Sequence, residues 1–336
     1  MNRKIFYDYI KSFFVILIAL VFNINKCVYG EEEINLAFTI DNNYTIFNAI
    51  ALHSILNNNI SNSKYNIYII ENNLSPKNKK LLSDFVKSYN QNIQFINVNT
   101  DSIDSGTTLY KHYNCTHVTK IGTARILLPL LLPENIDKVL YLDSDILVRS
   151  DLKELYDTDL TGYAAAMGAD HWVYVSGKFD TEPPPYYCNS GVILINLKYW
   201  RDNNITQELI NCIANTQLTY PDQDAINIVL GEHIKLLHKN WNNQLYYGNP
   251  IDSDTDHGII HYISQRKPWL YMPFCRYCKN IYLEYWKHTP FHLTRFLFIP
   301  KGIAAYYKYF CFYDYRDIQK KIKRYRNEYV DPNELE

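Results

Sequence analysis

From residue 31 onward the sequence alternates short β-rich runs with segments of helical period, and this alternation restricts the fold more than any other feature. Apolar, β-branched and aromatic residues fill runs at 34–40, 65–70, 93–98 and 138–142. Between them, segments 46–56 and 76–86 carry apolar residues at helical spacing, and a further helix is expected over 123–131. This order of strands and helices predicts an α/β domain with a largely parallel sheet.

The composition fits a globular chain that does not bind nucleic acid. The 336 residues are 47% hydrophobic, which is enough for a packed core. The 34 Lys and Arg residues balance 35 Asp and Glu residues, whereas a nucleic-acid-binding protein normally shows a basic excess. We therefore expect no nucleic-acid partner.

The N-terminal 30 residues have the features of a targeting segment. Arg3, Lys4 and Lys11 precede an apolar run at 13–22, which is shorter than the roughly 20 residues that span a bilayer. The small-residue site at 28–30 then favours a cleaved signal peptide, with an uncleaved signal anchor as the alternative. Either reading predicts a membrane-associated protein or one of the secretory pathway. The six cysteines beyond this segment permit disulfides without requiring them.

Residues 291–336 form a basic, aromatic C-terminal tail. Between Arg295 and Arg326 there are nine basic and two acidic residues, and apolar residues recur at helical spacing over 318–329. The tail is interpreted as one or two amphipathic helices that contact an anionic membrane surface. The alternative is a solvated helix packed on the domain.

Two polar motifs directly follow predicted strands, where ligands of α/β sheets bind. Asp41-Asn42-Asn43-Tyr44 follows the first strand, and Asp143-Ser144-Asp145 follows the run at 138–142. Two carboxylates at the end of a buried strand repel each other and need a cation or several hydrogen-bond donors. The motif therefore predicts a divalent metal site, although Asp is also common in turns.

His261 is the candidate for a third metal ligand. It ends the apolar run 258–260 and lies six residues before Lys267. An imidazole beside two carboxylates favours Mn²⁺ over Mg²⁺. A single histidine in this setting is also common as a core or loop residue.

Five motifs in order resemble glycosyltransferase family 8, which includes bacterial lipopolysaccharide glucosyl- and galactosyltransferases and the glycogenins. They are DNNY at 41–44, KVLYLDSDILV at 138–148, NSGVILINL at 189–197, DQDAIN at 222–227 and HYISQRKPW at 261–269. The resemblance covers about residues 34–290, so residues 31–290 are interpreted as the catalytic domain. It implies a GT-A fold, which is Rossmann-like and binds nucleotide sugars, with a mixed, mostly parallel central sheet and a C-terminal helical tail.

The resemblance also implies an activity. A hexose, glucose or galactose, would pass with retention from UDP-glucose or UDP-galactose to a glycan acceptor such as a cell-surface or lipid-linked oligosaccharide. Mn²⁺, with Mg²⁺ as the alternative, would be held by Asp143, Asp145 and His261. The family's donor-binding positions correspond to Asp41 and Asn43 at uridine, Tyr44 stacked on uracil, Asn189 at the sugar, and Ser264 and Lys267 at the diphosphate.

The remaining positions concern catalysis and the acceptor. Arg125, Asp222 and Gln223 match positions near the donor sugar, and His117 matches a position near the acceptor. The family usually has Gly where this chain has Ser264. Since a neutral amide such as that of Gln223 is a poor nucleophile, a front-face route is favoured, in which the departing diphosphate accepts the acceptor's proton.

Two alternative functions remain open from the sequence. One is a glycogenin-like protein that glucosylates itself, which the 31 Tyr residues permit. The other is a non-catalytic sugar-binding protein on the same fold. Intact Asp143, Asp145, His261 and Lys267 argue against the second alternative.

Overall fold

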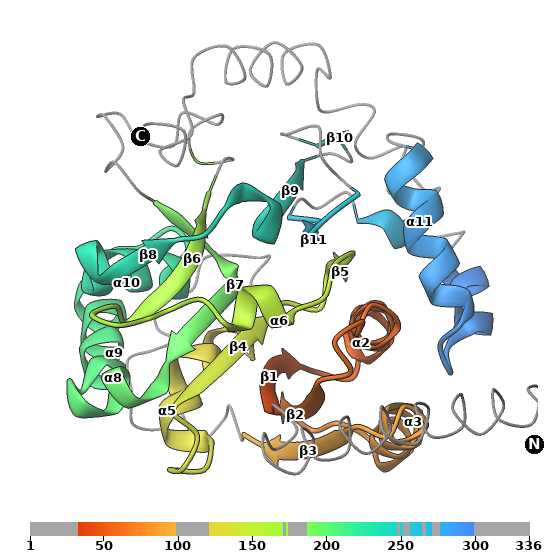
Figure 1. Cartoon of the computed structure of the whole chain (residues 1–336), viewed down its shortest axis with the longest axis horizontal. Helices are drawn as coiled ribbons and strands as arrows, with labels where there is room; N and C mark the ends of the chain where they lie inside the picture. Colours follow the sequence, from red (N-terminus) through yellow and green to blue (C-terminus); the bar gives the residue numbers. More distant parts are fainter. Residues whose placement is uncertain are drawn as a thin grey trace, which may run out of the picture.

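A seven-stranded sheet forms the centre of the computed structural model, which describes residues 33–98, 121–170, 173, 187–246, 249–250, 256–263, 267–270 and 276–298 (Figure 1). The strand order is β3-β2-β1-β4-β7-β6-β8. The strands are β1 (Glu33–Ile40), β2 (Lys64–Glu71), β3 (Asn92–Asn97), β4 (Lys138–Leu142), β6 (Ala165–Ala169), β7 (Cys188–Asn196) and β8 (Ile234–Leu236). Only β7 runs antiparallel to its neighbours β4 and β6, and the other pairs are parallel. The predicted mixed, mostly parallel sheet is confirmed.

Helices cover both faces of this sheet, because successive side chains of a strand point to opposite sides. In β4, Leu140 and Leu142 enter a core packed against α2 (Thr45–Asn57), α3 (Pro76–Lys87) and α6 (Lys153–Tyr156). Val139 and Tyr141 enter the opposite core. That core packs against η2 (Gly122–Leu127), α5 (Leu128–Leu131), α8 (Leu197–Asp202), α9 (Ile205–Asn215) and α10 (Pro221–Leu230). The apolar runs of the strands thus form two hydrophobic layers.

A second sheet, ordered β10-β9-β11-β5, adjoins the first (Figure 1). Its strands are β5 (Ile146–Val148), β9 (Asn243–Tyr246), β10 (Asn249–Pro250) and β11 (Ile259–His261), and η3 (Gly231–His233) and η4 (Lys239–Asn242) precede β9. Because β5 follows β4 after only three residues, the chain passes from one sheet to the other at Asp143-Ser144-Asp145.

An aromatic core fastens the second sheet to α2. Phe47 of α2 stacks on Trp269 of η5 (Pro268–Leu270) with ring centroids 3.7 Å apart. Tyr282 and Trp286 of α11 (Arg276–Lys287) close this core, and η6 (His292–Phe298) follows. The segment that carries Lys267 is therefore packed against the helix that follows β1.

The predicted elements are confirmed with one exception. The start of α3 agrees in detail, since the Ser75 hydroxyl accepts a hydrogen bond from the Asn78 backbone N–H at 3.2 Å and Pro76 is the first helical residue. The helix expected over 123–131 is wrong in type, because a 3₁₀ helix (η2) is followed by the single turn of α5. Pro129 has no N–H to continue a helical hydrogen-bond ladder through this segment.

Several predictions lie outside the described residues. These are the N-terminal segment 1–30, His117, Ser264 and the tail beyond residue 298. Within the described part of the chain, no helix combines the length and apolar character that a bilayer span requires. Cys188 and Cys212, whose side chains are described, are free thiols.

Candidate functional site

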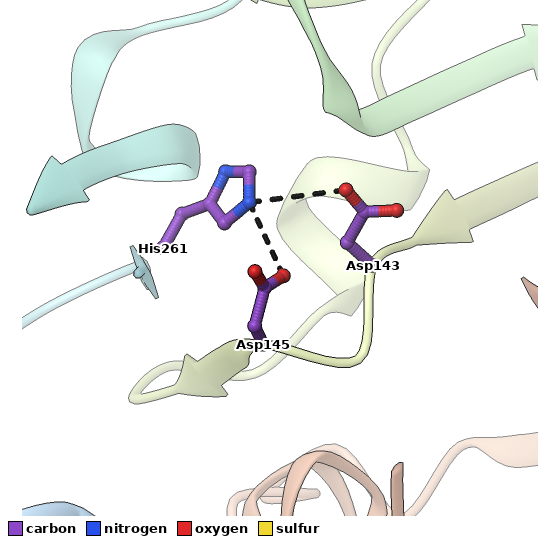
Figure 2. Close-up of side chains that lie close together, drawn as sticks. All are labelled: Asp143, Asp145 and His261. Atoms are coloured by element: carbon purple, nitrogen blue, oxygen red, sulfur yellow. Dashed lines mark ion pairs between the residues drawn. The ribbon is translucent and has the colours of Figure 1, made fainter. Parts of the chain in front are cut away.

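The junction between the two sheets brings Asp143, Asp145 and His261 together (Figure 2). Asp143 and Asp145 follow β4, whereas His261 ends β11, which pairs with β5 so that His261 lies opposite Ile146. The backbone N–H of Tyr262 donates to the Asp145 carbonyl at 2.9 Å and extends this pairing. Strand pairing, rather than closeness in the sequence, therefore places the imidazole beside the carboxylates.

Each carboxylate has one oxygen bound by the protein and the other turned toward His261. Asp143 Oδ1 accepts from the Tyr141 hydroxyl at 2.7 Å and from Arg125 Nη2 at 3.1 Å. Asp145 Oδ2 accepts from Lys267 Nζ at 2.5 Å. The remaining oxygens, Asp143 Oδ2 and Asp145 Oδ1, lie 3.9 and 3.4 Å from His261 Nε2.

These three residues fit a divalent cation. Their ligand atoms lie within 4.8 Å of one another, and two carboxylate oxygens and an imidazole nitrogen form a ligand set that suits such an ion. Burial alone raises the pKa of Asp145, but the ammonium charge of the adjacent Lys267 outweighs it and holds this pKa well below its usual value. The carboxylate is therefore ionised and ready to bind a cation.

Gly191 leaves the space in front of these ligand atoms open. A Cβ atom at this position would lie 2.2 Å from His261 Cε1 and 2.9 Å from Asp143 Oδ2. The Gly191 carbonyl also accepts from the Asp143 backbone N–H at 2.8 Å. Any side chain at position 191 would therefore collide with two of the three candidate ligands.

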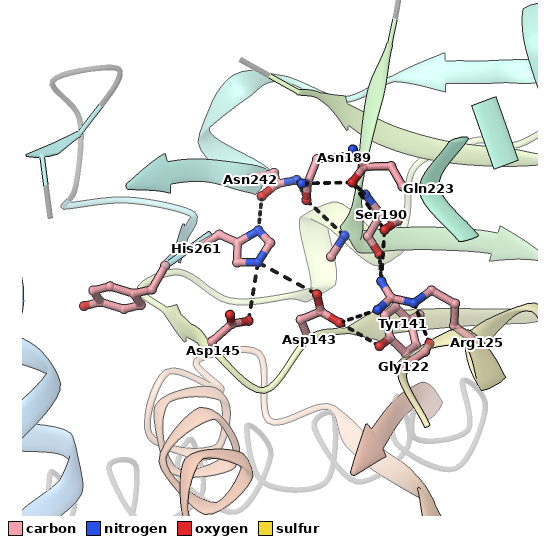
Figure 3. A network of polar contacts seen from close by, with 12 residues as sticks. Gly122, Arg125, Tyr141, Asp143, Asp145, Asn189, Ser190, Gln223, Asn242 and His261 are labelled. Atoms are coloured by element: carbon pink, nitrogen blue, oxygen red, sulfur yellow. Dashed lines mark hydrogen bonds and ion pairs between the residues drawn. The ribbon is translucent and has the colours of Figure 1, made fainter. Parts of the chain in front are cut away.

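A second polar network lies next to the three ligands and contains the residues expected at the donor sugar (Figure 3). The Gln223 side-chain Nε2 donates to Asp170 Oδ2 at 2.8 Å, and its Oε1 accepts from the Ser190 backbone N–H at 3.0 Å. Asn189 Nδ2 lies 3.2 Å from both Gln223 Oε1 and Asp170 Oδ2. Asp170, Asn189, Ser190 and Gln223 are all buried, so packing and hydrogen bonds hold their side chains next to the three candidate ligands.

Arg125 joins the two networks. Its Nε lies 3.0 Å from Asp222 Oδ2, in the first turn of α10, while Nη2 holds Asp143. Nη1 donates to the Ser190 hydroxyl at 3.1 Å, and the guanidinium lies over the Tyr141 ring at 4.6 Å. A buried arginine thus pairs with a candidate metal ligand and with a carboxylate expected near the sugar.

The first motif forms a tight turn at the end of β1. Asp41 Oδ1 accepts from the backbone N–H groups of Asn43 and Tyr44 at 2.8 and 3.0 Å, and Tyr44 precedes α2. Burial raises the pKa of Tyr44 above its usual value, and the charges of Asp145, Asp143 and Asp41 raise it further. The Tyr44 hydroxyl therefore stays protonated, and it lies close enough to Asp143 and Asp145 to interact with their charges.

The structure brings together most of the residues that the sequence indicated. Contacts join the side chains of Arg125, Asp143, Asp145, Asn189, Asp222, Gln223, His261 and Lys267 directly or through one residue. Asp41 and Asn43 lie at the end of β1, and His117 and Ser264 are outside the described residues. The donor, acceptor and metal roles of these residues remain predictions.

Sequence reasoning missed several members of the networks, namely Tyr141, Asp170, Ser190, Gly191 and Asn242. Asp170 had a usable signal, because it directly follows the apolar strand β6 as Asp143 follows β4. Ser190 and Gly191 stood within a quoted motif without an assigned role. Asn242 had no local signal, since strand pairing brings it to the site.

Comparisons with known proteins bear on the family to which the chain belongs. The model of a family described as glycosyl transferase family 8 matches residues 35–272. General stress protein A of Bacillus subtilis is 29% identical over 259 residues, a match that covers 71% of this chain and 88% of that protein. A lipopolysaccharide 1,2-glucosyltransferase of Escherichia coli is 27% identical, with 77% of this chain and 81% of that protein covered.

The fold is also found among solved structures. The galactosyltransferase LgtC, in complex with donor and acceptor sugar analogs, superposes with a TM-score of 0.65 at 24% identity, covering 76% of this chain and 96% of that one. This likeness confirms the GT-A fold. Because the family model spans the sheet, the Asp143–Asp145 motif and His261, we conclude that this chain is a glycosyltransferase and belongs to glycosyl transferase family 8.

Proposed function

We propose that this protein transfers a hexose from a UDP-sugar to a glycan acceptor, with retention of configuration and with the help of a divalent metal ion. One observation carries the proposal: His261 Nε2 lies close to Asp143 Oδ2 and Asp145 Oδ1, the one oxygen of each carboxylate that is turned toward the imidazole. Buried polar groups that suit a sugar lie next to these three ligand atoms. Membership of the family supports the transfer itself.

The names of relatives support a hexose donor and a glycan acceptor. A lipopolysaccharide 1,2-glucosyltransferase of E. coli and a lipopolysaccharide 1,3-galactosyltransferase of Salmonella typhimurium match 77% and 71% of this chain. UDP-glucose and UDP-galactose are therefore the first donors to test. The acceptor in this proposal is an oligosaccharide of the lipopolysaccharide type or another lipid-linked glycan.

The mixed nitrogen and oxygen ligand set favours Mn²⁺, with Mg²⁺ as the alternative. When bound, the ion supplies Lewis-acid stabilisation of the negative charge on the leaving diphosphate. Lys267 lies beside Asp145, so its ammonium group adds positive charge at the same place. Tyr44, Asp41 and Asn43 extend the donor site toward the nucleoside.

Retention proceeds on one face of the sugar in this proposal. The bond between the anomeric carbon and the diphosphate breaks, the bond to the acceptor hydroxyl forms on the same face, and the hydroxyl proton passes to the leaving phosphate oxygen. A double displacement would instead need a nucleophile, for which Gln223 and the nearby carboxylate of Asp222 are the candidates, and the contacts of both argue against it. Gln223 Oε1 already accepts from Ser190 N–H, and the Asp222 carboxylate is paired with Arg125, so both are weakened as nucleophiles.

A panel of UDP-sugars tests the proposal. Purified protein with Mn²⁺ is expected to release UDP from UDP-glucose or UDP-galactose, and EDTA is expected to stop the release. Asp145→Ala should abolish the release, while Asp84→Asn, at an exposed residue of α3, should leave it unchanged. Release that survives Asp145→Ala would contradict the metal-dependent model. Wild-type protein that binds UDP-sugar but releases no UDP even when an oligosaccharide acceptor of the lipopolysaccharide type is added would support the non-catalytic alternative.

In the same proposal the enzyme works at a membrane surface, through its N-terminal segment or its basic tail. Leu293 and Phe296 of η6, in the first residues of this tail, support the contact, since both are exposed, at 67% and 53%, and flank Arg295. Wild-type protein should sediment with vesicles that contain anionic lipid, and the double variant Leu293→Ser, Phe296→Ser should sediment less. Ile60→Ser, at a residue 79% exposed in the turn after α2, is the matched control. Equal sedimentation of all three proteins would refute the surface contact.

A further inference from the structure

We propose that Asn242 is a positioning residue, which fixes the tautomer of His261 and links the metal ligands to the residues that face the donor sugar. The inference rests on the proposed metal-dependent transfer and adds to it a group that touches neither metal nor sugar. Asn242 ends η4, immediately before β9, and is only 1% exposed.

The Asn242 side chain connects the two networks of the site (Figure 3). Its Oδ1 lies 2.9 Å from His261 Nδ1, and its Nδ2 lies 3.0 Å from Asn189 Oδ1. Asn189 in turn contacts Gln223 and Asp170. The single amide of Asn242 therefore connects a candidate metal ligand to the residues expected to bind the sugar.

The packing around Asn242 leaves its side chain little freedom. A Cβ atom at position 168 of β6 would lie 2.9 Å from Asn242 Cβ. The glycine at this position therefore allows Asn242 to pack closely against the β6 backbone. A completely buried amide that makes hydrogen bonds at both ends loses those bonds when it rotates. Asn242 is thus held in one orientation.

Backbone groups determine which end of each amide donates. The Gly191 N–H donates to Asn189 at 3.0 Å, so the Asn189 atom at this point must be the oxygen. The Ser190 N–H fixes Gln223 Oε1 as an acceptor in the same way, so Asn189 must present its nitrogen to Gln223. Two independent backbone donors therefore give Asn189 the same orientation.

The orientation passes from Asn189 to His261. Because Asn189 presents an oxygen to Asn242, Asn242 must donate through Nδ2, which leaves its Oδ1 facing His261. An amide oxygen can only accept, so His261 carries its proton on Nδ1. In the neutral imidazole this leaves a lone pair on Nε2, the nitrogen that faces Asp143 and Asp145.

The consequence concerns both halves of the site. Metal ligation by a histidine requires a lone pair on the ligating nitrogen, and a hydrogen bond to the other nitrogen maintains it. Asn242 provides that hydrogen bond through its oxygen and orients Asn189 through its nitrogen. The two ends can be separated by mutation, because Asp keeps the acceptor but loses the donor.

The first measurement is the tautomer itself. Long-range ¹H–¹⁵N spectra of histidine-labelled protein at neutral pH distinguish Nδ1–H from Nε2–H, and a His261→Gln spectrum identifies the signal. Wild type and Asn242→Asp should show His261 protonated at Nδ1, whereas Asn242→Ala should lose this single form. Asn243→Ala is the matched control, since its buried amide has no hydrogen-bond partner among the described residues.

The second measurement separates the metal from the donor. Titration with Mn²⁺ alone, followed by calorimetry, should give a dissociation constant raised about tenfold to a hundredfold in Asn242→Ala. Asn242→Asp should keep its affinity for Mn²⁺, yet its KM for the UDP-sugar should rise because two acceptors then face each other at Asn189. A residue that only filled space would not produce this split.

The tautomer of His261 and its response to mutation of Asn242 can be measured whether or not the protein transfers a hexose. A wild-type His261 protonated at Nε2, or equal effects of Asn242→Ala and Asn243→Ala on tautomer and Mn²⁺ affinity, would overturn it. If Asn242→Ala does not fold, the split shown by Asn242→Asp decides alone. Should wild type bind no Mn²⁺ while its tautomer is Nδ1–H, the metal proposal fails but the tautomer assignment stands.

Discussion

Arg125 and Asp143 form an ion pair of 3.1 Å whose arginine is only 7% exposed, so a candidate metal ligand is held by a buried cation of the protein. The same guanidinium pairs with Asp222, whose side chain is 5% exposed. Two carboxylates from distant parts of the chain therefore share one positive charge, and neither has another arginine or lysine partner among the described ion pairs.

Replacing Arg125 by Met should destabilise the protein strongly, because it leaves two poorly solvated carboxylates without their cation. The free energy of unfolding is expected to fall by about 3–5 kcal/mol, measured by urea denaturation. Arg125→Lys keeps the charge but cannot hold both carboxylates, so its loss should be intermediate. A value for Arg125→Met within about 0.5 kcal/mol of wild type would show that the pair adds nothing.

Gly191→Ala should remove the metal site while the fold persists. The new methyl group would lie 2.2 Å from His261 Cε1, so the imidazole has to move away from the carboxylates. Calorimetric titration with Mn²⁺ should show affinity reduced at least tenfold, as for loss of a residue that orients a ligand. The control is Gly162→Ala, where nothing lies within 4 Å but φ is +80°, which should cost stability and leave Mn²⁺ affinity unchanged.

Phe47→Leu should weaken donor binding from a distance. The substitution removes the stack on Trp269, worth about 1 kcal/mol beyond burial, and loosens the segment that carries Lys267. We expect a higher KM for the UDP-sugar together with a lower unfolding midpoint. Phe38→Leu, at a completely buried position of β1, should lower the midpoint alone. An unchanged KM for the UDP-sugar in Phe47→Leu would show that the aromatic core does not influence donor binding.

Acid should destabilise the contact between α2, α3 and α11 through His53. Burial, reinforced by the nearby His288, lowers the pKa of His53 from 6.5 to about 4. The rings of Phe85, Tyr89 and Tyr285 also surround it, and the Tyr89 hydroxyl lies 3.1 Å from its Nδ1. Since the unfolded state binds the proton first, this contribution to stability is present above pH 6.5 and is lost as the pH falls toward 4.

Urea unfolding across this pH window measures the effect. His53→Phe should flatten the decline, by on the order of 2 kcal/mol at the acid end, whereas His292→Gln at an exposed site should follow wild type. A decline equally steep in His53→Phe would assign the acid sensitivity to other groups.

The sequence predicted most of the fold because its strongest signals are local. Apolar runs such as 138–142 are strands buried on both faces, and a Ser-Pro pair starts α3 as expected. The helix over 123–131 was wrong in type because this short, mostly apolar segment shows too little periodicity to distinguish the 3.0 residues per turn of a 3₁₀ helix from the 3.6 of an α-helix. Pro129, which has no backbone N–H, removes one hydrogen bond from the ladder.

The candidate site was predictable where a motif marks it and hidden where only pairing creates it. Asp143 and Asp145 stand together after a strand, His261 ends an apolar run shortly before Lys267, and resemblance to a family added Asn189 and Gln223. Asn242 comes to His261 through the connection of η4 to β9, which pairs with β11. Such a contact depends on the register of strands distant in the sequence, and no local pattern encodes it.

The division of the ligand set between two sheets also dictates an order of events during synthesis. Asp143 and Asp145 leave the ribosome together, but β11 and His261 follow only after a further stretch of chain that takes roughly ten seconds to make. Until then Arg125 is available to pair with Asp143, but the imidazole is absent. A metal ion that needs all three groups could therefore bind only after translation has passed residue 261 and the second sheet has closed.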